Sequence, residues 1–366
     1  MRSVLPLLIL AFVLPACESP VPLGTGSDDD EEPRPRLDHC QLTTDDLMVG
    51  AEWDAIRAID DPRFVPADEL PIDRISPDER VIGLRIDGES LAIPHGEIWA
   101  HEVLNLDRSV DLAVTYCPLT GSALAFDRAP VGGVRMGVSG FLLHENLVLF
   151  DRNDRPVLWA QMSASSLCGG VPRAERLPQW PVIEVRWETW RALHPNTLVL
   201  DARDEASSAA DPSSPTSGTR STSPWHAPAA SFDRSERVIG APSSRTDPGI
   251  AFSFRGLVER TGDRQVISFE HDGESYRLLW SDRAMGGMAY FPRTESGQHV
   301  NLAPEEGTGP EEGGFRDRNT GSLFTLDGRG VSGPLAGEAL VPLVEAYVAY
   351  RGPWLDFHPD SRMWGE

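Results

Sequence analysis

The sequence is poor in cysteine and in positive charge. It contains four Cys in 366 residues, and 33 Lys and Arg against 56 Asp and Glu give a formal net charge of −23. Nucleic acids and anionic lipid surfaces attract cationic proteins, so this balance makes both poor partners. Phosphate loops, serine-hydrolase elbows, zinc-protease helices and haem-attachment motifs are also missing from the sequence. No common enzyme class is therefore indicated by a motif.

Long apolar runs are missing as well, except at the start of the chain. Arg2 precedes an apolar segment at residues 4–14, and Leu14-Pro15-Ala16 leads directly to Cys17. This pattern is typical of a secretory signal peptide, and the run is shorter than the roughly 20 residues that span a bilayer. Its end resembles a bacterial lipobox, which implies removal of residues 1–16 and attachment of a lipid with fatty acids such as palmitate to Cys17. The alternative is an ordinary signal peptide followed by an unmodified cysteine.

The expected location follows from this anchor. A lipidated Cys17 would hold the mature chain to a bacterial membrane in the cell envelope, facing the periplasm or the cell exterior. Residues 17–36 are rich in Pro, Gly and acidic side chains, and we expect a flexible tether there. Residues 204–231 are rich in Ser, Ala, Pro and Thr, and we expect a disordered linker. It would separate a first block, residues 37–203, from a second block, residues 232–366.

The two blocks share short segments in the same order. These are Glu79-Arg80-Val81-Ile82-Gly83 and Glu236-Arg237-Val238-Ile239-Gly240, Asp151-Arg152-Asn153 and Asp317-Arg318-Asn319, and His194-Pro195-Asn196-Thr197 and His358-Pro359-Asp360-Ser361. Their offsets are similar: 236 − 79 = 157, 317 − 151 = 166 and 358 − 194 = 164. Three matches in order predict that the blocks are diverged copies of one unit.

Strand patterns dominate each block. Asp87-Gly88 and Asp272-Gly273 each separate two apolar runs, which is a strong signal for a β-hairpin. Further short strands are expected at 112–117, 122–127, 134–138, 147–150 and 156–161. Apolar spacing predicts one final helix per block, at 183–193 and at 340–347, and His194-Pro195 should end the first of these. The sequence therefore predicts an α+β, β-rich fold in which each copy ends in a helix.

Reactive side chains gather in the first block. The candidate site residues are His101, Glu102, Asn105, Cys117, Asp127 and Gln161. His101, Glu102 and Cys117 could hold a transition metal such as Zn or Cu, since imidazole, carboxylate and thiolate suit these ions. Cys117 could instead be a nucleophile with His101 as its base. The structural alternative is a buried Cys117, or one disulfide-linked to Cys168, with His101, Glu102 and Gln161 satisfying buried polar groups.

The cysteines allow one disulfide in an oxidising compartment. If Cys17 carries the lipid, Cys40, Cys117 and Cys168 remain, which permits one disulfide and one free thiol. The sequence leaves the pairing open. Cys168 is a favourable partner because it precedes glycines, whose backbone adopts strained turns at low cost.

The sequence resembles an uncharacterised bacterial family catalogued as domain of unknown function 3179. The resemblance is carried by His101-Glu102-Val103-Leu104-Asn105, Thr115-Tyr116-Cys117-Pro118-Leu119, Gly121, Phe126-Asp127-Arg128, Gly137-Val138-Ser139-Gly140, Asp151-Arg152, Trp159-Ala160-Gln161 and His194-Pro195. It covers most of the mature chain but implies no particular activity. Thr120 stands where the family has the second cysteine of a Cys-Pro-Leu-Cys segment, and Leu106 stands where it has an aspartate. A Cys-x-x-Cys redox pair is therefore excluded in this chain.

Two classes of function remain open from the sequence. As a binding or scaffolding lipoprotein, the chain would present its folded part to an envelope protein or to a small-molecule ligand. As a metal-binding protein or a Cys-dependent enzyme, it would use the first block alone. The reactive residues occur in only one of the two blocks, so we expect the second block to contribute shape and the first to contribute chemistry.

Overall fold

The computed structural model describes residues 47–71, 73–168, 175–202, 234–244, 247–260, 262–305, 307 and 314–366. All of them belong to one compact unit, residues 34–366. The expected signal peptide, the tether and the linker at 204–231 lie outside the described residues, as do Cys17 and Cys40. Strands outnumber helices throughout, so the β-rich α+β prediction is confirmed. Within the described ranges, no helix is both long and apolar enough to cross a membrane.

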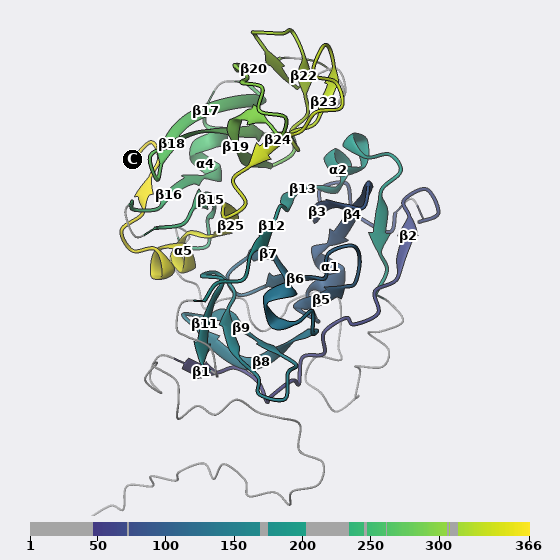
Figure 1. Cartoon of the computed structure of the whole chain (residues 1–366), viewed down its shortest axis with the longest axis vertical. Helices are drawn as coiled ribbons and strands as arrows, with labels where there is room; N and C mark the ends of the chain where they lie inside the picture. Colours follow the sequence, from purple (N-terminus) through teal and green to yellow (C-terminus); the bar gives the residue numbers. More distant parts are fainter. Residues whose placement is uncertain are drawn as a thin grey trace, which may run out of the picture. The chain divides into compact units, whose positions relative to one another are not determined.

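The first block is built from three sheets (Figure 1). The first sheet has the order β13-β3-β4-β14-β2, with β2 Phe64–Pro66, β3 Arg80–Ile86, β4 Glu89–Pro94, β13 Ile183–Arg186 and β14 Leu198–Leu200. The second has the order β12-β7-β6-β5, with β5 Val103–Leu106, β6 Leu112–Cys117, β7 Ser122–Asp127 and β12 Gln179–Trp180. The third has the order β1-β8-β9-β10-β11, with β1 Leu47–Val49, β8 Met136–Leu143, β9 Asn146–Asp151, β10 Leu158–Ala160 and β11 Ser165–Cys168. Its helices are α1 His95–Ile98, α2 Trp187–Leu193 and the 3-10 helix η2 Ala129–Val131.

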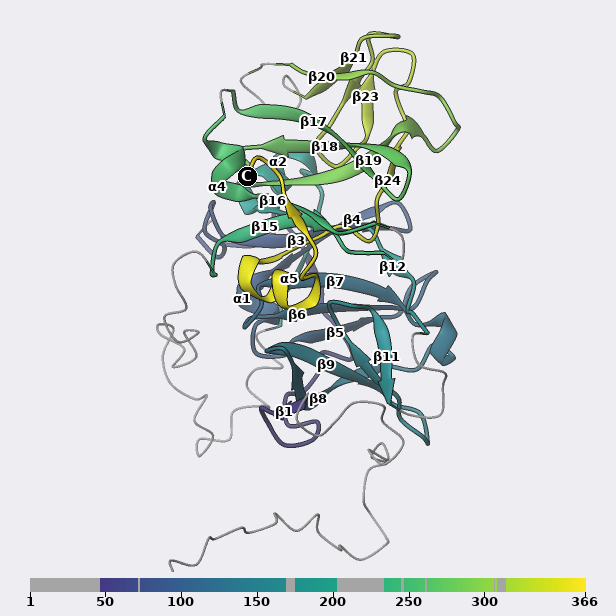
Figure 2. The same cartoon turned by 90° about the vertical axis from the view of Figure 1, so that its left-hand side faces the viewer.

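The second block also contains three sheets. The first has the order β25-β15-β16-β26, with β15 Arg237–Ala241, β16 Ile250–Ser253, β25 Tyr347–Tyr350 and β26 Arg362–Met363. The second, whose long strands lie side by side in Figure 2, has the order β17-β18-β19-β24, with β17 Arg264–His271, β18 Glu274–Ser281, β19 Gly286–Thr294 and β24 Leu340–Pro342. The third has the order β20-β21-β22-β23, with β20 Leu302–Pro304, β21 Phe315–Asp317, β22 Leu323–Phe324 and β23 Gly330–Ser332. Its helices are α4 Phe254–Val258 and α5 Arg351–Phe357.

The strand order of each sheet in the second block matches a sheet of the first. In the first sheet, β13-β3-β4-β14 corresponds to β25-β15-β16-β26, and in both only the last pair is parallel. In the second, β12-β7-β6-β5 corresponds to β24-β19-β18-β17, and in the third, β8-β9-β10-β11 corresponds to β20-β21-β22-β23. The first block adds β1 and β2 at sheet edges.

The repeated Val-Ile-Gly segment makes room for a tryptophan. A Cβ added at Gly83 would lie 2.3 Å from Trp190 Cζ3, and one added at Gly240 would lie 2.9 Å from Trp354 Cζ2. Each tryptophan is fully buried in the final helix of its block. Glycine is therefore required at Gly83 because the indole ring packs directly on the strand backbone, and at Gly240 because both the indole and the Ile250 carbonyl oxygen, 2.4 Å from an added Cβ, leave no space.

The repeated His-Pro segment ends that helix. Helix α2 stops before His194 and helix α5 stops before His358, as expected for residues that precede proline. Three residues after each histidine, Thr197 Oγ1 and Ser361 Oγ accept the indole N–H of the helix tryptophan at 2.9 and 3.0 Å. The histidine segments are thus local structural features, as the sequence indicated.

Most of the expected elements are confirmed, but the final helices begin later than predicted. Both Asp-Gly hairpins form, and strands occur at every expected position. Residues 183–186 form β13 and only then continue into α2. The helix expected at 340–347 is wrong, since this range forms β24 and the start of β25 and the helix follows at 351–357. Pro342 pairs with Tyr290 of β19, a long-range contact that apolar spacing alone does not reveal.

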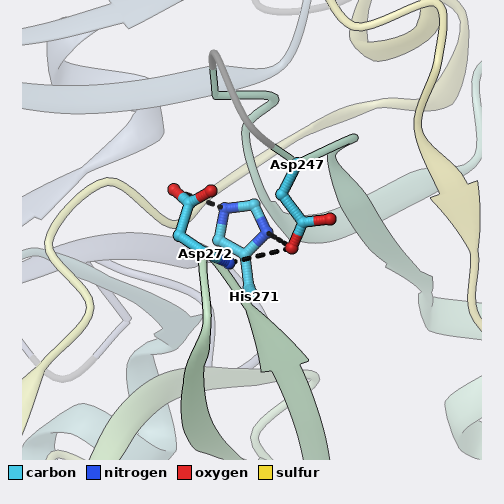
Figure 3. A group of neighbouring side chains, drawn as sticks. All are labelled: Asp247, His271 and Asp272. Carbon is cyan, nitrogen blue, oxygen red and sulfur yellow. Dashed lines mark hydrogen bonds and ion pairs between the residues drawn. The ribbon is translucent and has the colours of Figure 1, made fainter.

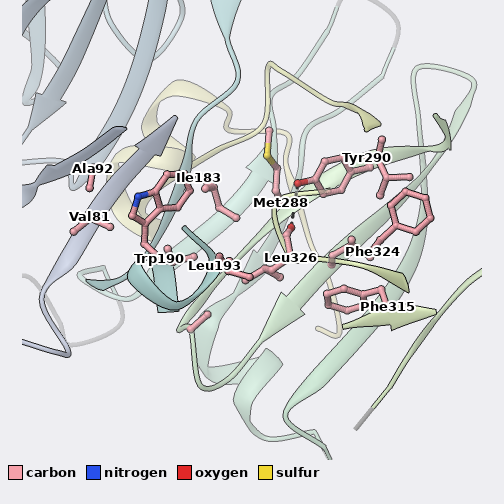
Figure 4. Packing of buried hydrophobic residues seen from close by; sticks show 14 of the residues in the cluster. Val81, Ala92, Ile183, Trp190, Leu193, Met288, Tyr290, Phe315, Phe324 and Leu326 are labelled. Atoms are coloured by element: carbon pink, nitrogen blue, oxygen red, sulfur yellow. Dashed lines mark hydrogen bonds between the residues drawn. The ribbon is translucent and has the colours of Figure 1, made fainter. Parts of the chain in front are cut away.

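The hydrophobic cores extend across both blocks. One core joins Val81 and Trp190 of the first block to Phe315 and Phe324 of the second (Figure 4). Another joins Phe126, Trp159 and neighbours of the first block to Tyr347 and Trp354 of the second. The blocks share their interior, so we expect them to unfold together rather than as separate domains.

Two backbone hydrogen bonds between the blocks are reciprocal. Arg186, which precedes α2, donates its N–H to the Ala284 carbonyl at 3.0 Å, and Tyr350, which precedes α5, donates to the Thr120 carbonyl at 2.7 Å. Ala284 and Thr120 lie in the matching turns β18–β19 and β6–β7. The blocks therefore pack through the same elements in both directions.

Candidate functional site

Cys117 is a buried, free thiol at the end of β6. Its Sγ lies 3.8 Å from the Glu145 carbonyl oxygen, a weak hydrogen bond. Burial raises the pKa of the Cys117 thiol to about 11, and the nearby Glu102 carboxyl adds to this effect. At neutral pH the sulfur is therefore protonated, whereas a nucleophile or metal ligand needs the thiolate. Its suggested disulfide with Cys168 is wrong, because Cys168 is disulfide-bonded while Cys117 is free; the partner of Cys168 lies outside the described residues.

Glu102 has a strained backbone and an unusual charge state. Its φ of 59° is a conformation that few residues other than glycine adopt, and such strain concentrates at functional sites. Burial raises the pKa of its carboxyl to about 8, so the side chain is mostly neutral at pH 7. Its carbonyl accepts the Tyr116 N–H at 2.8 Å. At the matching place in the second block, Gln265 pairs with Trp280, and its amide donates to the Leu257 carbonyl at 2.7 Å.

His101, Asn105 and Asp127 make structural hydrogen bonds. His101 Nδ1 lies 2.8 Å from the Arg57 carbonyl oxygen. The Asn105 amide is fully buried and donates to the Met136 carbonyl at 2.9 Å, and its oxygen accepts the Met136 N–H at 2.9 Å. Asp127 accepts the N–H of Ala129 at 2.8 Å at the start of η2. These contacts join strands and cap a turn, so they account for the three side chains without a ligand.

Gln161 is the centre of a buried polar network. Its Nε2 donates to Thr115 Oγ1 at 2.9 Å, and its Oε1 accepts from Ser122 Oγ and from Asn146 Nδ2, both at 2.7 Å. Asn146 also donates to Thr120 Oγ1 at 2.9 Å. Each of these five side chains is fully buried. Thr120, which replaces the second cysteine of the family motif, is therefore a member of a satisfied network and not a vacant ligand position.

A buried charged cluster forms around Glu184, next to Tyr116, and the sequence did not predict it. Glu184 Oε2 lies 3.0 Å from His95 Nε2 and 3.6 Å from Arg80 Nε. Burial alone would raise the pKa of Glu184, but His95 and Arg80 lower it below its usual value. Burial lowers the pKa of Arg80 to about 10 and also lowers that of His95. Because Arg80 donates to the Met285 carbonyl of the second block at 2.7 Å, the cluster also joins the two blocks.

The second block has apolar residues at the positions that match Glu184 and His95. Val348 pairs with Ile239 as Glu184 pairs with Ile82, and Phe254 begins α4 as His95 begins α1. The rings of Phe254 and Trp280 are 4.7 Å apart, matching His95 and Tyr116 at 4.2 Å. The buried carboxylate and imidazole are thus confined to the first block, whereas Arg237 repeats Arg80.

An open cleft lies over the segments Asp151-Arg152-Asn153 and Trp159-Ala160-Gln161. Its volume is about 580 Å³. Residues that line it include Asp151, Asn153, Asp154, Arg155, Trp159 and Glu175. Asp151 is fully buried and accepts the Trp159 indole N–H at 3.0 Å and the Asn153 amide at 2.9 Å. Pro130, Val131 and Val157 complete the lining, so the cleft combines polar and apolar side chains over a floor held by hydrogen bonds.

The described residues contain one group of three His, Cys, Asp or Glu side chains whose ligand atoms all lie within 4.8 Å of one another. It comprises Asp247, His271 and Asp272 of the second block, residues that the sequence did not single out. The hypothesised set of His101, Glu102 and Cys117 is not gathered in this way. The only sequence signal near the new group was the hairpin turn at Asp272-Gly273.

One comparison with known proteins gives a match. A family model described as "Protein of unknown function (DUF3179)" matches residues 53–361. No curated protein and no solved structure matches the chain.

Proposed function

Because this chain belongs to the DUF3179 family, whose description assigns no activity, we propose a function from its own residues. The protein is an exported lipoprotein that binds a partner or a small molecule and does not catalyse a thiol-dependent reaction. The observation that carries this proposal is the state of Cys117: buried, unpaired, and with a pKa raised to about 11. A thiol in this state is a core residue and not a nucleophile.

The cleft over Asp151 is the surface we propose for a small polar ligand. It is open, its floor is held by hydrogen bonds, and its lining combines carboxylates, a guanidinium and an indole. A few placed polar groups beside an aromatic side chain are typical of small-molecule sites. Sugars, amino acids and polyamines are suitable probes for a thermal-shift screen. We expect at least one class to raise the Tm of the wild type but not of Asn153→Trp, which fills the cleft.

Asn319→Trp is the matched control, because Asn319 has the corresponding place in the Asp317-Arg318-Asn319 segment of the second block. It should keep the response of the wild type. A response that persists in Asn153→Trp would place the ligand elsewhere and contradict the assignment of the cleft.

Membrane attachment through Cys17 rests on the apolar run and the lipobox-like end of the sequence. In the native host, Cys17→Ser should release the protein from the membrane or leave it with its signal peptide attached. Detergent-phase partitioning of the processed protein shows whether it still carries a lipid anchor. A processed Cys17→Ser protein that still enters the detergent phase would contradict lipidation.

We infer that the second block arose by duplication of the first. The ordered sequence repeats support this, together with the matching strand orders and the glycine–tryptophan contacts. The second block would then have kept the residues that fold the unit, such as Gly240 and Trp354. Polar residues of the first block have apolar counterparts there, such as Phe254 for His95.

The second candidate is a Cys-dependent or metal-dependent enzyme in the first block. The observation that favours it is Glu102, a strained, mostly neutral acid beside Cys117. Such an acid could donate or accept a proton near pH 8. Alkylation by iodoacetamide tests this candidate. If Cys117 is accessible and activated, it reacts in the folded protein, and Glu102→Gln slows that reaction.

A further inference from the structure

Three side chains meet at one corner of the second block (Figure 3). Asp247 lies in the loop before β16, His271 is the last residue of β17, and Asp272 begins the turn to β18. The turn is tight, with φ of 51° at Asp272 and 75° at Gly273. It directs the Asp272 N–H to Asp247 Oδ2 at 2.9 Å, which holds that carboxylate beside the imidazole ring.

The distances around the imidazole do not fit direct hydrogen bonds. His271 Nδ1 lies 3.8 Å from Asp247 Oδ2, and Nε2 lies 3.6 Å from Asp272 Oδ2. Hydrogen bonds from N–H to O are about 2.7–3.2 Å long. His271 is 4% exposed, and its Nδ1 is buried with no hydrogen-bond partner. A buried nitrogen without a partner is costly, so this geometry calls for a group between the side chains.

A metal ion fits the space between these atoms. Nitrogen and carboxylate ligands bind Zn²⁺ at about 2.0–2.2 Å, so two ligands of one tetrahedral ion lie about 3.4 Å apart. One ligand atom each from Asp247, His271 and Asp272 can be chosen so that all three lie within 4.8 Å of one another. The 3.8 Å between Nδ1 and Asp247 and the 3.6 Å between Nε2 and Asp272 are each close to this value, so either nitrogen–carboxylate pair can share an ion after a small contraction.

We propose that Asp247, His271 and Asp272 form a binding site for a divalent transition-metal cation such as Zn²⁺. A neutral imidazole and two carboxylates balance the charge of the ion. Mixed nitrogen and oxygen ligands favour Zn²⁺ and its neighbours, whereas Ca²⁺ takes six to eight oxygens.

The two ring nitrogens face different carboxylates, so the ion takes one of them and the other carboxylate turns toward it. Asp272 is the side chain that turns. Turning the carboxylate gives up the hydrogen bond that its Oδ1 accepts from Ser244 Oγ; because the side chain is 38% exposed at the tip of a hairpin, water can replace that bond. The same exposure gives water access to the fourth ligand position. This is a site that exchanges its ion with solvent and not one enclosed in a core.

The first block offers a matched control. Asp87 lies in the β3–β4 turn, which corresponds to the β15–β16 loop that holds Asp247. It accepts the backbone N–H of Ser109, in the turn between β5 and β6, at 3.2 Å. Its surroundings differ, because Arg108 of that turn forms an ion pair with Glu89 at 3.4 Å. Arg108 therefore lies where the second block has His271. Because its guanidinium is cationic, we expect no metal to bind at this place.

Zinc titration of the metal-stripped, full-length protein in detergent, followed by calorimetry, tests the proposal. We expect a Zn²⁺ site that is weakened at least tenfold in Asp247→Asn, in Asp272→Asn and in His271→Gln, and unchanged in Asp87→Asn. Zn²⁺ should raise the Tm of the wild type, and Ca²⁺ should not displace it. Circular dichroism shows whether each variant folds. If a variant of a buried residue fails to fold, the affinity of Asp272→Asn for Zn²⁺ decides the test, because this substitution changes an exposed side chain.

Three results would overturn the proposal. The first is an absence of Zn²⁺ binding up to millimolar concentration. The second is Zn²⁺ binding of equal affinity in Asp272→Asn and the wild type, which would place the ion on other residues. The third is tighter binding of Ca²⁺ than of Zn²⁺. None of these results bears on the cleft or on Cys17, so the proposed function is tested separately.

Discussion

Replacing Glu102 by glutamine should change how the stability of the protein depends on pH. Burial raises the pKa of the Glu102 carboxyl from 4.5 to about 8 in the folded state. The folded protein therefore holds a proton that the unfolded chain loses between these two values, and the free energy of unfolding falls as pH rises through this window. Glutamine keeps the shape of the neutral acid and cannot ionise, and the second block already has Gln265 at the matching position.

The size of the effect follows from the shift. One pKa unit corresponds to about 1.4 kcal/mol, so a shift of about 3.5 units corresponds to at most about 5 kcal/mol. Glu102 keeps partial contact with solvent, and we expect about half of this, roughly 2 kcal/mol, to be measured above pH 8. Wild type and Glu102→Gln should be similar in stability near pH 4.5 and should diverge as pH rises.

Urea unfolding followed by tryptophan fluorescence, at intervals between pH 4.5 and 9, measures this difference. Glu145→Gln is the control, because it removes an exposed carboxyl from the neighbouring turn and should leave the pH dependence unchanged. If the curves of wild type and Glu102→Gln stay parallel over the whole range, the carboxyl is solvated and the argument from burial is wrong.

Three other outcomes are expected. Burial alone would raise the pKa of Asp327, but His194 and then Arg329 lower it to about 2. Asp327→Asn should therefore lower the free energy of unfolding by about 2 kcal/mol above pH 4. In acid-unfolding curves, this difference from the wild type should vanish as pH falls toward 2. Gly83→Ala should lower stability by about 1–3 kcal/mol in thermal unfolding, because its Cβ would lie 2.3 Å from Trp190, and the same substitution should cost less when it is made in a Trp190→Leu background. Cys117 should react with a thiol reagent only after denaturation; rapid labelling of the folded protein would disprove its burial.

The sequence pointed to a polar region of the first block, but not to the residues that line the cleft or to the Asp247, His271 and Asp272 group. The segment from His101 to Gln161 was selected by its reactive residue types, and it does surround a polar interior. Residue type alone does not tell whether a side chain has partners. His101 contacts a backbone carbonyl and Thr120 belongs to a hydrogen-bond network, and both contacts are set by strands far apart in the chain. Glu184 lay in the predicted helix at 183–193, but it belongs to strand β13, which places it between Arg80 and His95.

The sequence by itself determined the features whose causes are local. Asp-Gly turns require positive φ, alternating apolar residues form strands, and a proline ends the helix before it, so hairpins, strands and the stop at His194 were all predictable. Tertiary structure decided what depends on distant partners. Residues 340–342 became a strand because β19 offers an edge to pair with, and Tyr347 begins a strand that pairs with β15. Asp247 meets His271 because the loop before β16 contacts the turn after β17. The cores joined both blocks for the same reason, since burial depends on which surfaces meet and not on residue spacing along the chain.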